Sequence, residues 1–231
     1  VINYCEDEIL TIVDYSVSLI NLRAALLSWW RENGRSFLWQ PTTSSFQIPM
    51  AEMMLRRTQA RQVVPVYARF ISQYPDARAL ANALVSEVAD TPYSLGSSWR
   101  VPAFQQLAKV LVDQYDGDVP VRYNALTRLL DVGDYAAVAV CDFAFDQPRI
   151  IVDTNTVRVV GRICGISSHV ESRRRKPIRK LLEAFLDHLL PWQYNYALLD
   201  LAELICVPTN PPYSNCPLVL FCKTGQEHPH V

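Results

Sequence analysis

The chain has 231 residues, of which 50% are hydrophobic and 19% are charged. This is enough apolar material for one large core or for two smaller lobes of a globular protein. No apolar run approaches the roughly 20 residues that cross a bilayer, so we expect no membrane association and a cytoplasmic location. The formal net charge of −1 gives no overall attraction to nucleic acid, so any DNA-binding surface must be local.

Gly is scarce, with 7 residues, and helix-compatible residues dominate long stretches, so we predict an all-α fold. A first long helix, ended by Gly34, is predicted from apolar residues at helical spacing, namely Leu22, Ala25, Leu26, Trp29 and Trp30. The next helix carries Pro49 in its first turn. Further helices are predicted over residues 59–72, 77–90, 102–115, 122–130, 135–146, 153–164, 177–190 and 193–205.

Residues 129–135, with the sequence Leu-Leu-Asp-Val-Gly-Asp-Tyr, lie between two predicted helices and are typical of a helix–hairpin–helix motif. We expect Gly133 to supply the positive φ of the tight turn, after which a helix restarts at once. Such a hairpin points backbone N–H groups at a phosphate and anchors it without regard to sequence. An ordinary turn between two helices is the alternative.

Asp153 follows the apolar pair Ile151 and Val152 and stands at a predicted helix start. An aspartate at this position is commonly only an N-cap. The alternative is catalytic, because a carboxylate at a helix N-terminus can stabilise the positive charge that develops on a sugar when its glycosidic bond breaks.

Two further clusters stand out. The six cysteines comprise three isolated ones, Cys5, Cys141 and Cys164, and three close to the C-terminus, Cys206, Cys216 and Cys222. This grouping favours a metal site over disulfides. A basic run over residues 173–180 contains six Lys and Arg residues, and its simplest interpretation is a solvated surface.

Six segments, in the same order, resemble the endonuclease III and adenine-glycosylase (MutY-type) superfamily, most closely its thymine-DNA mismatch (MIG) branch. They are residues 37–40, 51–58, the hairpin, 152–162, 195–202 and the cysteine tail. The resemblance implies two interleaved helical lobes with the active site in the cleft between them. One lobe would span residues 46–150, with the helix–hairpin–helix at 122–146. Residues 21–45 and 151–231 would form the other, with 1–20 as an N-terminal extension and a cysteine-containing loop at 206–222.

The resemblance also implies catalytic roles. Asp153 matches the catalytic carboxylate, and Glu52 matches a carboxylate that polarises the leaving base or orders water, beside Trp39 and Gln40 in the base pocket. Tyr135 stands where bifunctional enzymes of the endonuclease III type have lysine. A phenol forms no Schiff base, so we expect a monofunctional enzyme without lyase activity that leaves an abasic site. Surface ion pairing of Glu52 and core packing of Tyr135 are the alternatives.

DNA-contacting residues are implied in the same way. Arg56 and Arg57 would reach into the base stack beside the estranged base, although simple solvent exposure of at least one is the alternative. Val132, Gly133 and Asp134 would contact the phosphate. The expected partner is double-stranded DNA with a mismatched or damaged base, bound by a monomer in association with the nucleoid. A mismatch lowers the cost of flipping the base out of the duplex.

Tyrosine at position 135 resembles the thymine-mismatch branch, and the chain ends soon after the cysteine tail, so we expect no further domain of the kind that MutY-type enzymes use against 8-oxoguanine. Both features favour thymine or uracil opposite guanine as the substrate. An adenine or other modified-base glycosylase is one alternative, and a catalytically silent relative that binds mismatched DNA is another.

The chain departs from the family at two places. The family's Cys-x6-Cys-x2-Cys-x5-Cys loop holds a [4Fe–4S] cluster, but here the frame is Cys206, Tyr213, Cys216 and Cys222. A cluster with a non-cysteine ligand and loss of the cluster are both open. The second departure is Leu130-Asp131, where the family usually has Pro-Gly. An acidic residue in a phosphate-facing hairpin disfavours DNA binding or changes the geometry of the hairpin.

Overall fold

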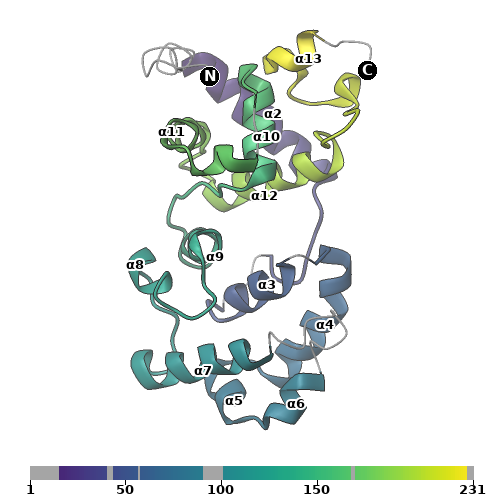
Figure 1. Ribbon diagram of the computed structural model, residues 1–231. Coiled ribbons are helices and arrows are strands. Elements are labelled where there is room, and N and C mark those ends of the chain that lie inside the picture. The colour runs from purple at the N-terminus through teal and green to yellow at the C-terminus, as the bar shows by residue number, and fades with distance from the viewer. Residues whose placement is uncertain (1–15, 41–43, 57, 91–100, 168–169, 228–231) are drawn as a thin grey trace. The chain divides into compact units, whose positions relative to one another are not determined.

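A computed structural model describes residues 16–40, 44–56, 58–90, 101–167 and 170–227 (Figure 1). All regular secondary structure in these ranges is helical, which confirms the all-α prediction. The chain divides into two compact units. The terminal unit is formed by residues 1–35 and 148–231, and the central unit by residues 36–147. Within the described ranges, no helix combines the length and apolarity that a membrane crossing requires.

The terminal unit joins the two ends of the chain. Its helices are α2 (Ser16–Asn33), α10 (Thr154–Cys164), α11 (Lys176–Phe185), α12 (Pro191–Leu204) and α13 (Lys223–Glu227). Helix α12 packs against both α2 and α10, and α10 also contacts α13. The core between them contains the fully buried Leu26, Leu182, Tyr194 and Leu198. Segments from the beginning and the end of the sequence therefore share one hydrophobic core.

Two buried polar side chains of α12 fasten neighbouring segments to this core. Asp200, only 1% exposed, accepts hydrogen bonds from the Trp30 indole at 2.9 Å and from the Arg35 backbone N–H at 2.8 Å, and its Oδ1 lies 2.7 Å from Arg35 Nε. Asn195 accepts from the Ile151 N–H at 3.0 Å and donates to the Arg149 carbonyl at 2.8 Å. Asn195 thereby fixes the segment that leads into α10.

The central unit contains α3 (Gln47–Leu55), α4 (Ala60–Gln73), α5 (Ala77–Asn82), α6 (Val85–Asp90), α7 (Val101–Tyr115), α8 (Tyr123–Leu126) and α9 (Asp134–Ala139). A π-helical turn over Val140–Ala144 continues α9. Met50, Met54, Phe70 and Leu107 are fully buried in the core of this unit. Helix α3 packs against both α4 and α9, so it links the start of the unit to the hairpin.

Aromatic packing places the first boundary between the units ahead of Phe37. Phe37 stacks on Trp39 with a centroid distance of 4.8 Å, and Trp39 meets Tyr67 of α4 edge-on at 5.3 Å. Described residues from Ser36 onward therefore belong to the central unit, whereas the sequence suggested a boundary at residue 46. Ile150 is buried in the core of the terminal unit, so the second boundary lies at Pro148.

Three predicted helices are shorter than the sequence pattern suggested. The helix predicted over 77–90 is broken into α5 and α6, because Ala83 is extended and its carbonyl accepts a hydrogen bond from Gln105 of α7 at 2.6 Å. The helix predicted over 177–190 ends at Phe185. The Asp187 carboxylate accepts the N–H groups of Leu189 and Leu190, which replaces helical hydrogen bonding ahead of α12. The helix predicted over 122–130 is limited to the four residues of α8.

Candidate active-site and DNA-contact residues

Asp153 is the N-cap of α10 and forms a capping box with Thr156. Its Oδ1 accepts the backbone N–H groups of Asn155 at 2.9 Å and Thr156 at 2.8 Å, and Thr156 Oγ1 accepts the Asp153 N–H at 3.0 Å. The second oxygen, Oδ2, accepts from Asn155 Nδ2 at 3.0 Å. The capping interpretation is correct, and the same hydrogen bonds hold the half-buried carboxylate in one orientation at the positive end of the helix dipole.

Arg158 supports this arrangement, a role that the sequence analysis did not assign. Its Nη1 donates to Asn155 Oδ1 at 3.0 Å, while Nε and Nη2 donate to the carbonyls of Cys206 at 2.8 Å and Ala202 at 3.0 Å. A chain of hydrogen bonds therefore runs from Asp153 through Asn155 and Arg158 to the C-terminal end of α12. The signal for this role was the helical i, i+3 spacing of Asn155 and Arg158.

Glu52 is buried in α3, with 5% of its surface exposed, and is therefore not a surface ion-pairing residue. Its neighbours in sequence, Ala51 and Met53, are buried as well. Because burial disfavours the charged carboxylate, the pKa of Glu52 is raised from 4.5 to about 8. At neutral pH Glu52 is mainly a neutral carboxylic acid, which can donate a hydrogen bond or a proton.

Trp39 and Gln40 occupy different environments. Trp39 is 2% exposed and packs between Phe37 and Tyr67. The Gln40 side chain accepts the Phe37 N–H through Oε1 at 2.9 Å, which fixes the amide orientation. Its buried Nε2 has no hydrogen-bond partner among the described residues. A buried donor without a partner costs about 1–3 kcal/mol, so Gln40 is suited to an acceptor on a ligand.

The hairpin differs from expectation in its backbone. The residue with positive φ is Asp131, at 58°, whereas Gly133 has φ −78° and ψ 177°. The expectation that Gly133 supplies the positive φ is therefore wrong. Aspartate tolerates the left-handed region better than most residues, which explains how Asp131 replaces the family's glycine. The turn is closed by a hydrogen bond from the Val132 N–H to the Leu129 carbonyl at 3.2 Å.

The remaining hairpin residues divide between core and surface. Val132 is buried in the core of the central unit, while Gly133 and Asp134 are exposed. Asp134 begins α9, and its carboxylate accepts a hydrogen bond from the Tyr123 hydroxyl. Tyr135, the second residue of α9, is half-buried. Gly133 and Asp134 are thus the solvent-exposed part of the motif.

Arg56 contacts the hairpin directly. The guanidinium Nη1 donates to the Asp131 carbonyl at 3.2 Å and lies 3.5 Å from Asp131 Oδ1. Arg56 is half-exposed, and it follows the last residue of α3. Arg57 lies outside the described residues. Asp131, the unexpected acidic residue of the hairpin, therefore pairs with one of the two arginines that the sequence associated with DNA.

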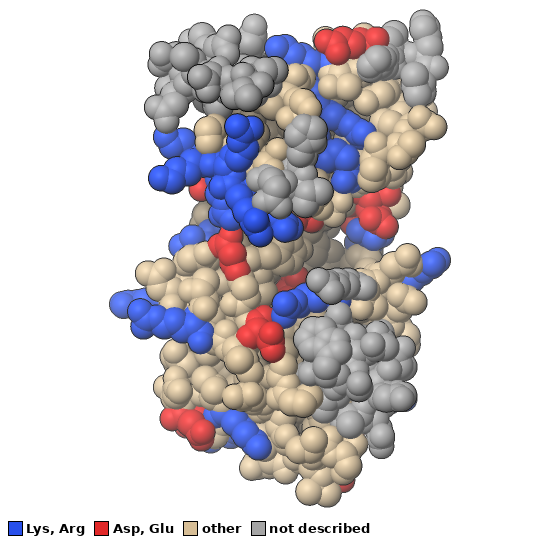
Figure 2. Space-filling view, viewed as in Figure 1, with Lys and Arg blue, Asp and Glu red and all other residues tan. Residues whose placement is uncertain are grey.

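The basic run of residues 173–180 forms part of the surface. Arg174, Arg175, Lys176 and Lys180 are exposed. Figure 2 shows Lys and Arg side chains gathered on one face over α11. The solvated-surface interpretation agrees with this exposure.

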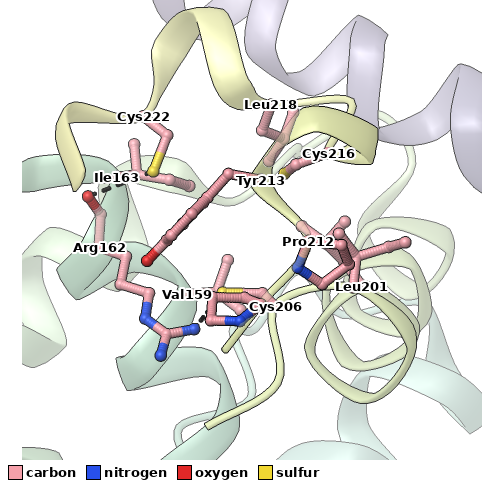
Figure 3. A pocket seen from close by; sticks show the side chains of 12 residues that line it. Val159, Arg162, Ile163, Leu201, Cys206, Pro212, Tyr213, Cys216, Leu218 and Cys222 are labelled. Atoms are coloured by element: carbon pink, nitrogen blue, oxygen red, sulfur yellow. Dashed lines mark hydrogen bonds between the residues drawn. The ribbon is translucent and has the colours of Figure 1, made fainter. Parts of the chain in front are cut away.

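The cysteine tail surrounds a small cavity in the terminal unit. Its lining includes Cys206, Tyr213, Cys216 and Cys222 together with Arg162 of α10 (Figure 3). In the described part of the chain, no group of three or more His, Cys, Asp or Glu side chains has the arrangement of a metal site. Three thiols and a phenol replace the four thiolates that a [4Fe–4S] cluster takes, and the buried Tyr213 ring projects into the space between them. These residues do not fit the cluster that the resemblance implied.

The helical architecture, the helix–hairpin–helix segment and the capped Asp153 define a class of all-α proteins, and comparison with known families specifies it. Residues 50–185 match the model of the HhH-GPD superfamily base excision DNA repair proteins. Because this match covers more than half of the chain, the protein belongs to that superfamily. The resemblance inferred from the sequence motifs is confirmed.

Several relatives match over nearly the whole chain. A thymine/uracil-DNA glycosylase of Pyrobaculum aerophilum is 33% identical over 93% of this chain and 94% of its own length. A thymine-DNA glycosylase of Aeropyrum pernix is 34% identical over 87% and 92%. Among solved structures, a thermostable thymine-DNA glycosylase superposes with a TM-score of 0.84 at 28% identity, over 91% of this chain and 97% of the other.

Proposed function

We propose that this protein is a monofunctional DNA glycosylase that removes thymine or uracil mispaired with guanine and leaves an abasic site. The observation that carries the proposal is the similarity to a thymine/uracil-DNA glycosylase over more than nine-tenths of both chains. The proposed partner is duplex DNA that contains the mismatch, bound by a monomer.

In the proposed reaction, the bond between the sugar C1′ and the base nitrogen breaks, and its electron pair leaves with the base. Positive charge then develops at C1′ and the ring oxygen. The Asp153 carboxylate would stabilise this charge and accept the proton of the attacking water, whose oxygen forms the new bond to C1′. The capping box, Asn155 and Arg158 hold Asp153 in place, so little reorganisation would be needed during the reaction.

The leaving base takes the bonding electron pair and becomes negatively charged. A hydrogen-bond or proton donor at one of its carbonyl oxygens therefore assists its departure. Glu52 is suited to this role because its pKa is raised to about 8 and the acid keeps its proton at neutral pH. The unpartnered Nε2 of Gln40 is a second donor. Thymine and uracil each present two carbonyl oxygens as acceptors, whereas adenine presents ring-nitrogen acceptors beside an amino group that donates. A pair of donors therefore matches the two carbonyl oxygens of thymine or uracil.

Absence of lyase activity follows from the chemistry of position 135. A lyase forms a Schiff base between an amine and the sugar, and the Tyr135 phenol cannot do so. In the same proposal, Arg56 and Arg57 contact the DNA beside the flipped nucleotide, and the backbone of Val132, Gly133 and Asp134 approaches a phosphate.

The test is single-turnover excision on duplexes with G:T, G:U, A:G or A:8-oxoguanine, each read with and without alkali. Strand cleavage at G:T and G:U that requires alkali is the expected result, because base removal alone leaves the strand intact and alkali then breaks it at the abasic site. Cleavage without alkali would refute the monofunctional assignment. The Asp153→Asn variant is the matched control and should yield no abasic product while still binding the mismatch.

A second candidate is an adenine glycosylase, since one from Buchnera aphidicola subsp. Baizongia pistaciae is 30% identical over 86% of this chain. This chain spans only 57% of that relative's length. Excision from A:8-oxoguanine without excision from G:T would favour this candidate. Binding to mismatched DNA with no product from any duplex would instead indicate a catalytically silent relative.

A further inference from the structure

The cysteine tail contains a tyrosine at the second ligand position of the family's cluster frame, and its ring is buried. We propose that Tyr213 replaces the iron–sulfur cluster as the centre on which the tail packs, so that the tail folds without metal and its three cysteines are packing residues. This inference concerns the terminal unit alone and does not depend on the proposed function.

The position of the ring is the first argument. Tyr213 is 8% exposed and lies in a short 3₁₀ turn over Tyr213–Asn215. Figure 3 shows its ring directed across the cavity, with Cys222 on one side and Cys206 on the other. The remaining cavity has a volume of about 10 Å³, which is about the space of one water molecule. A cluster of eight inorganic atoms cannot occupy it while the ring is present.

The surroundings of the ring are shaped to accept it. Gly225 of α13 lies against it, since a Cβ at Gly225 would be 3.3 Å from Tyr213 Cδ1. The buried Pro211 and Leu218 also line the cavity. An aromatic ring that replaces water or empty space in such a cavity contributes dispersion contacts and buried apolar area.

The sulfur atoms make contacts of their own. Cys206 Sγ accepts from Arg162 Nη1 at 3.3 Å, and Cys222 Sγ accepts from the Gly225 N–H at 3.3 Å. Cys222 Sγ also lies 3.4 Å from the Arg162 carbonyl, as a thiol that donates its proton. A cluster-bound thiolate has no proton to donate to a carbonyl.

Hydrogen bonds attach the tail to α10 without metal. Arg162 donates to the carbonyls of Val207 at 2.7 Å and Pro208 at 2.8 Å. The Thr224 hydroxyl donates to the Arg162 carbonyl at 3.0 Å. Arg162 therefore contacts both ends of the tail, and Tyr213 fills the space between them.

The first measurement is iron and acid-labile sulfide in the full chain, produced with cluster-assembly proteins and purified without oxygen. We expect only traces of either and no visible absorbance from a cluster. Iron and sulfide near the stoichiometry of a [4Fe–4S] cluster would overturn the proposal.

Thermal unfolding of variants provides the second measurement. Tyr213→Phe keeps the ring and should change the Tm by less than about 3 °C, whereas Tyr213→Ala should lower it by about 10 °C. The matched control is Cys216→Ser, at the half-buried thiol, which should change the Tm by less than about 3 °C. If Cys216→Ser lowered the Tm as much as Tyr213→Ala, the cysteines would be ligands and the proposal would be wrong. If Tyr213→Ala does not fold, the Tm values of Tyr213→Phe and Cys216→Ser still test the proposal. Tyr213→Phe would lose a phenolate ligand and Cys216→Ser a thiolate ligand, so a large fall in either Tm would show that a metal is bound.

Discussion

Replacing Glu52 with glutamine removes one ionisable group while keeping nearly the shape of the protonated acid. The pKa of Glu52 is raised from 4.5 to about 8 in the folded protein, so the folded state holds its proton more tightly than the unfolded chain does. The stabilising contribution of Glu52 is therefore fully present below pH 4.5 and is lost as the pH rises toward 8. The neutral glutamine carries no such dependence.

The magnitude follows from the size of the shift. At pH 7 the unfolded chain has released the proton that folded Glu52 retains. This difference lowers the free energy of unfolding of the wild type by about 3 kcal/mol at pH 7 and by about 1 kcal/mol at pH 5. The stability advantage of Glu52→Gln should thus grow by roughly 2 kcal/mol between these pH values. Urea unfolding followed by tryptophan fluorescence at pH 5, 6 and 7 measures it.

The control is Glu203→Gln, which removes an exposed carboxyl group from α12. If the difference between Glu52→Gln and the wild type were the same at every pH, Glu52 would not be the buried acid described above. Glu52→Gln also cannot transfer a proton to the leaving base, so its single-turnover excision of thymine should fall about 100-fold or more. Wild-type excision should decline above pH 8, where Glu52 loses its proton.

Three further predictions concern the supports of the site. Asp153→Asn keeps the Oδ1 acceptor of the N-cap but loses the Oδ2 that accepts from Asn155 Nδ2, so the free energy of unfolding should fall by about 1 kcal/mol while excision is lost. Retained turnover would contradict the assigned role. Arg158→Lys cannot reproduce three donors in one plane and should destabilise the protein by about 1–3 kcal/mol in urea unfolding. The excision step should also be slower, because Asn155 loses the hydrogen bond from Arg158 that holds it. Asp131→Gly removes an exposed ion pair with Arg56 and also a non-glycine residue with positive φ, so the free energy of unfolding should change by less than about 1 kcal/mol. The affinity for DNA, measured in a salt titration, should rise because a negative charge is removed from the hairpin. Unchanged affinity would indicate that this hairpin does not face DNA.

Local patterns predicted much of the helix order correctly. The helix starts at Asp153 and after Gln59 and the end before Gly34 agree with the structure within about two residues, which is the usual spread of helix boundaries. Two of the errors fall where a side chain replaces helical hydrogen bonding of the backbone. Gln105 of α7 binds the Ala83 carbonyl, and Asp187 binds the N–H groups of Leu189 and Leu190 just after it. Neither contact changes the apolar periodicity on which the predictions relied.

The candidate site divides in the same way. The sequence alone determined which residues to consider, because Asp153, Glu52 and Tyr135 stand in motifs of fixed spacing that resemble the family. It also identified the departures at Asp131 and Tyr213. It could not determine their consequences, since the environment of a side chain depends on segments far away in sequence.

The sequence by itself determined the all-helical class, the approximate order of helices and membership of the base excision repair superfamily, because helical periodicity, capping residues and short motifs are local properties. The tertiary structure alone decided that Glu52 is a buried acid, that Arg56 pairs with Asp131 across 75 positions, and that Tyr213 fills the space among the tail cysteines. The physical reason is that desolvation, ion pairing and cavity filling arise only when distant segments pack together.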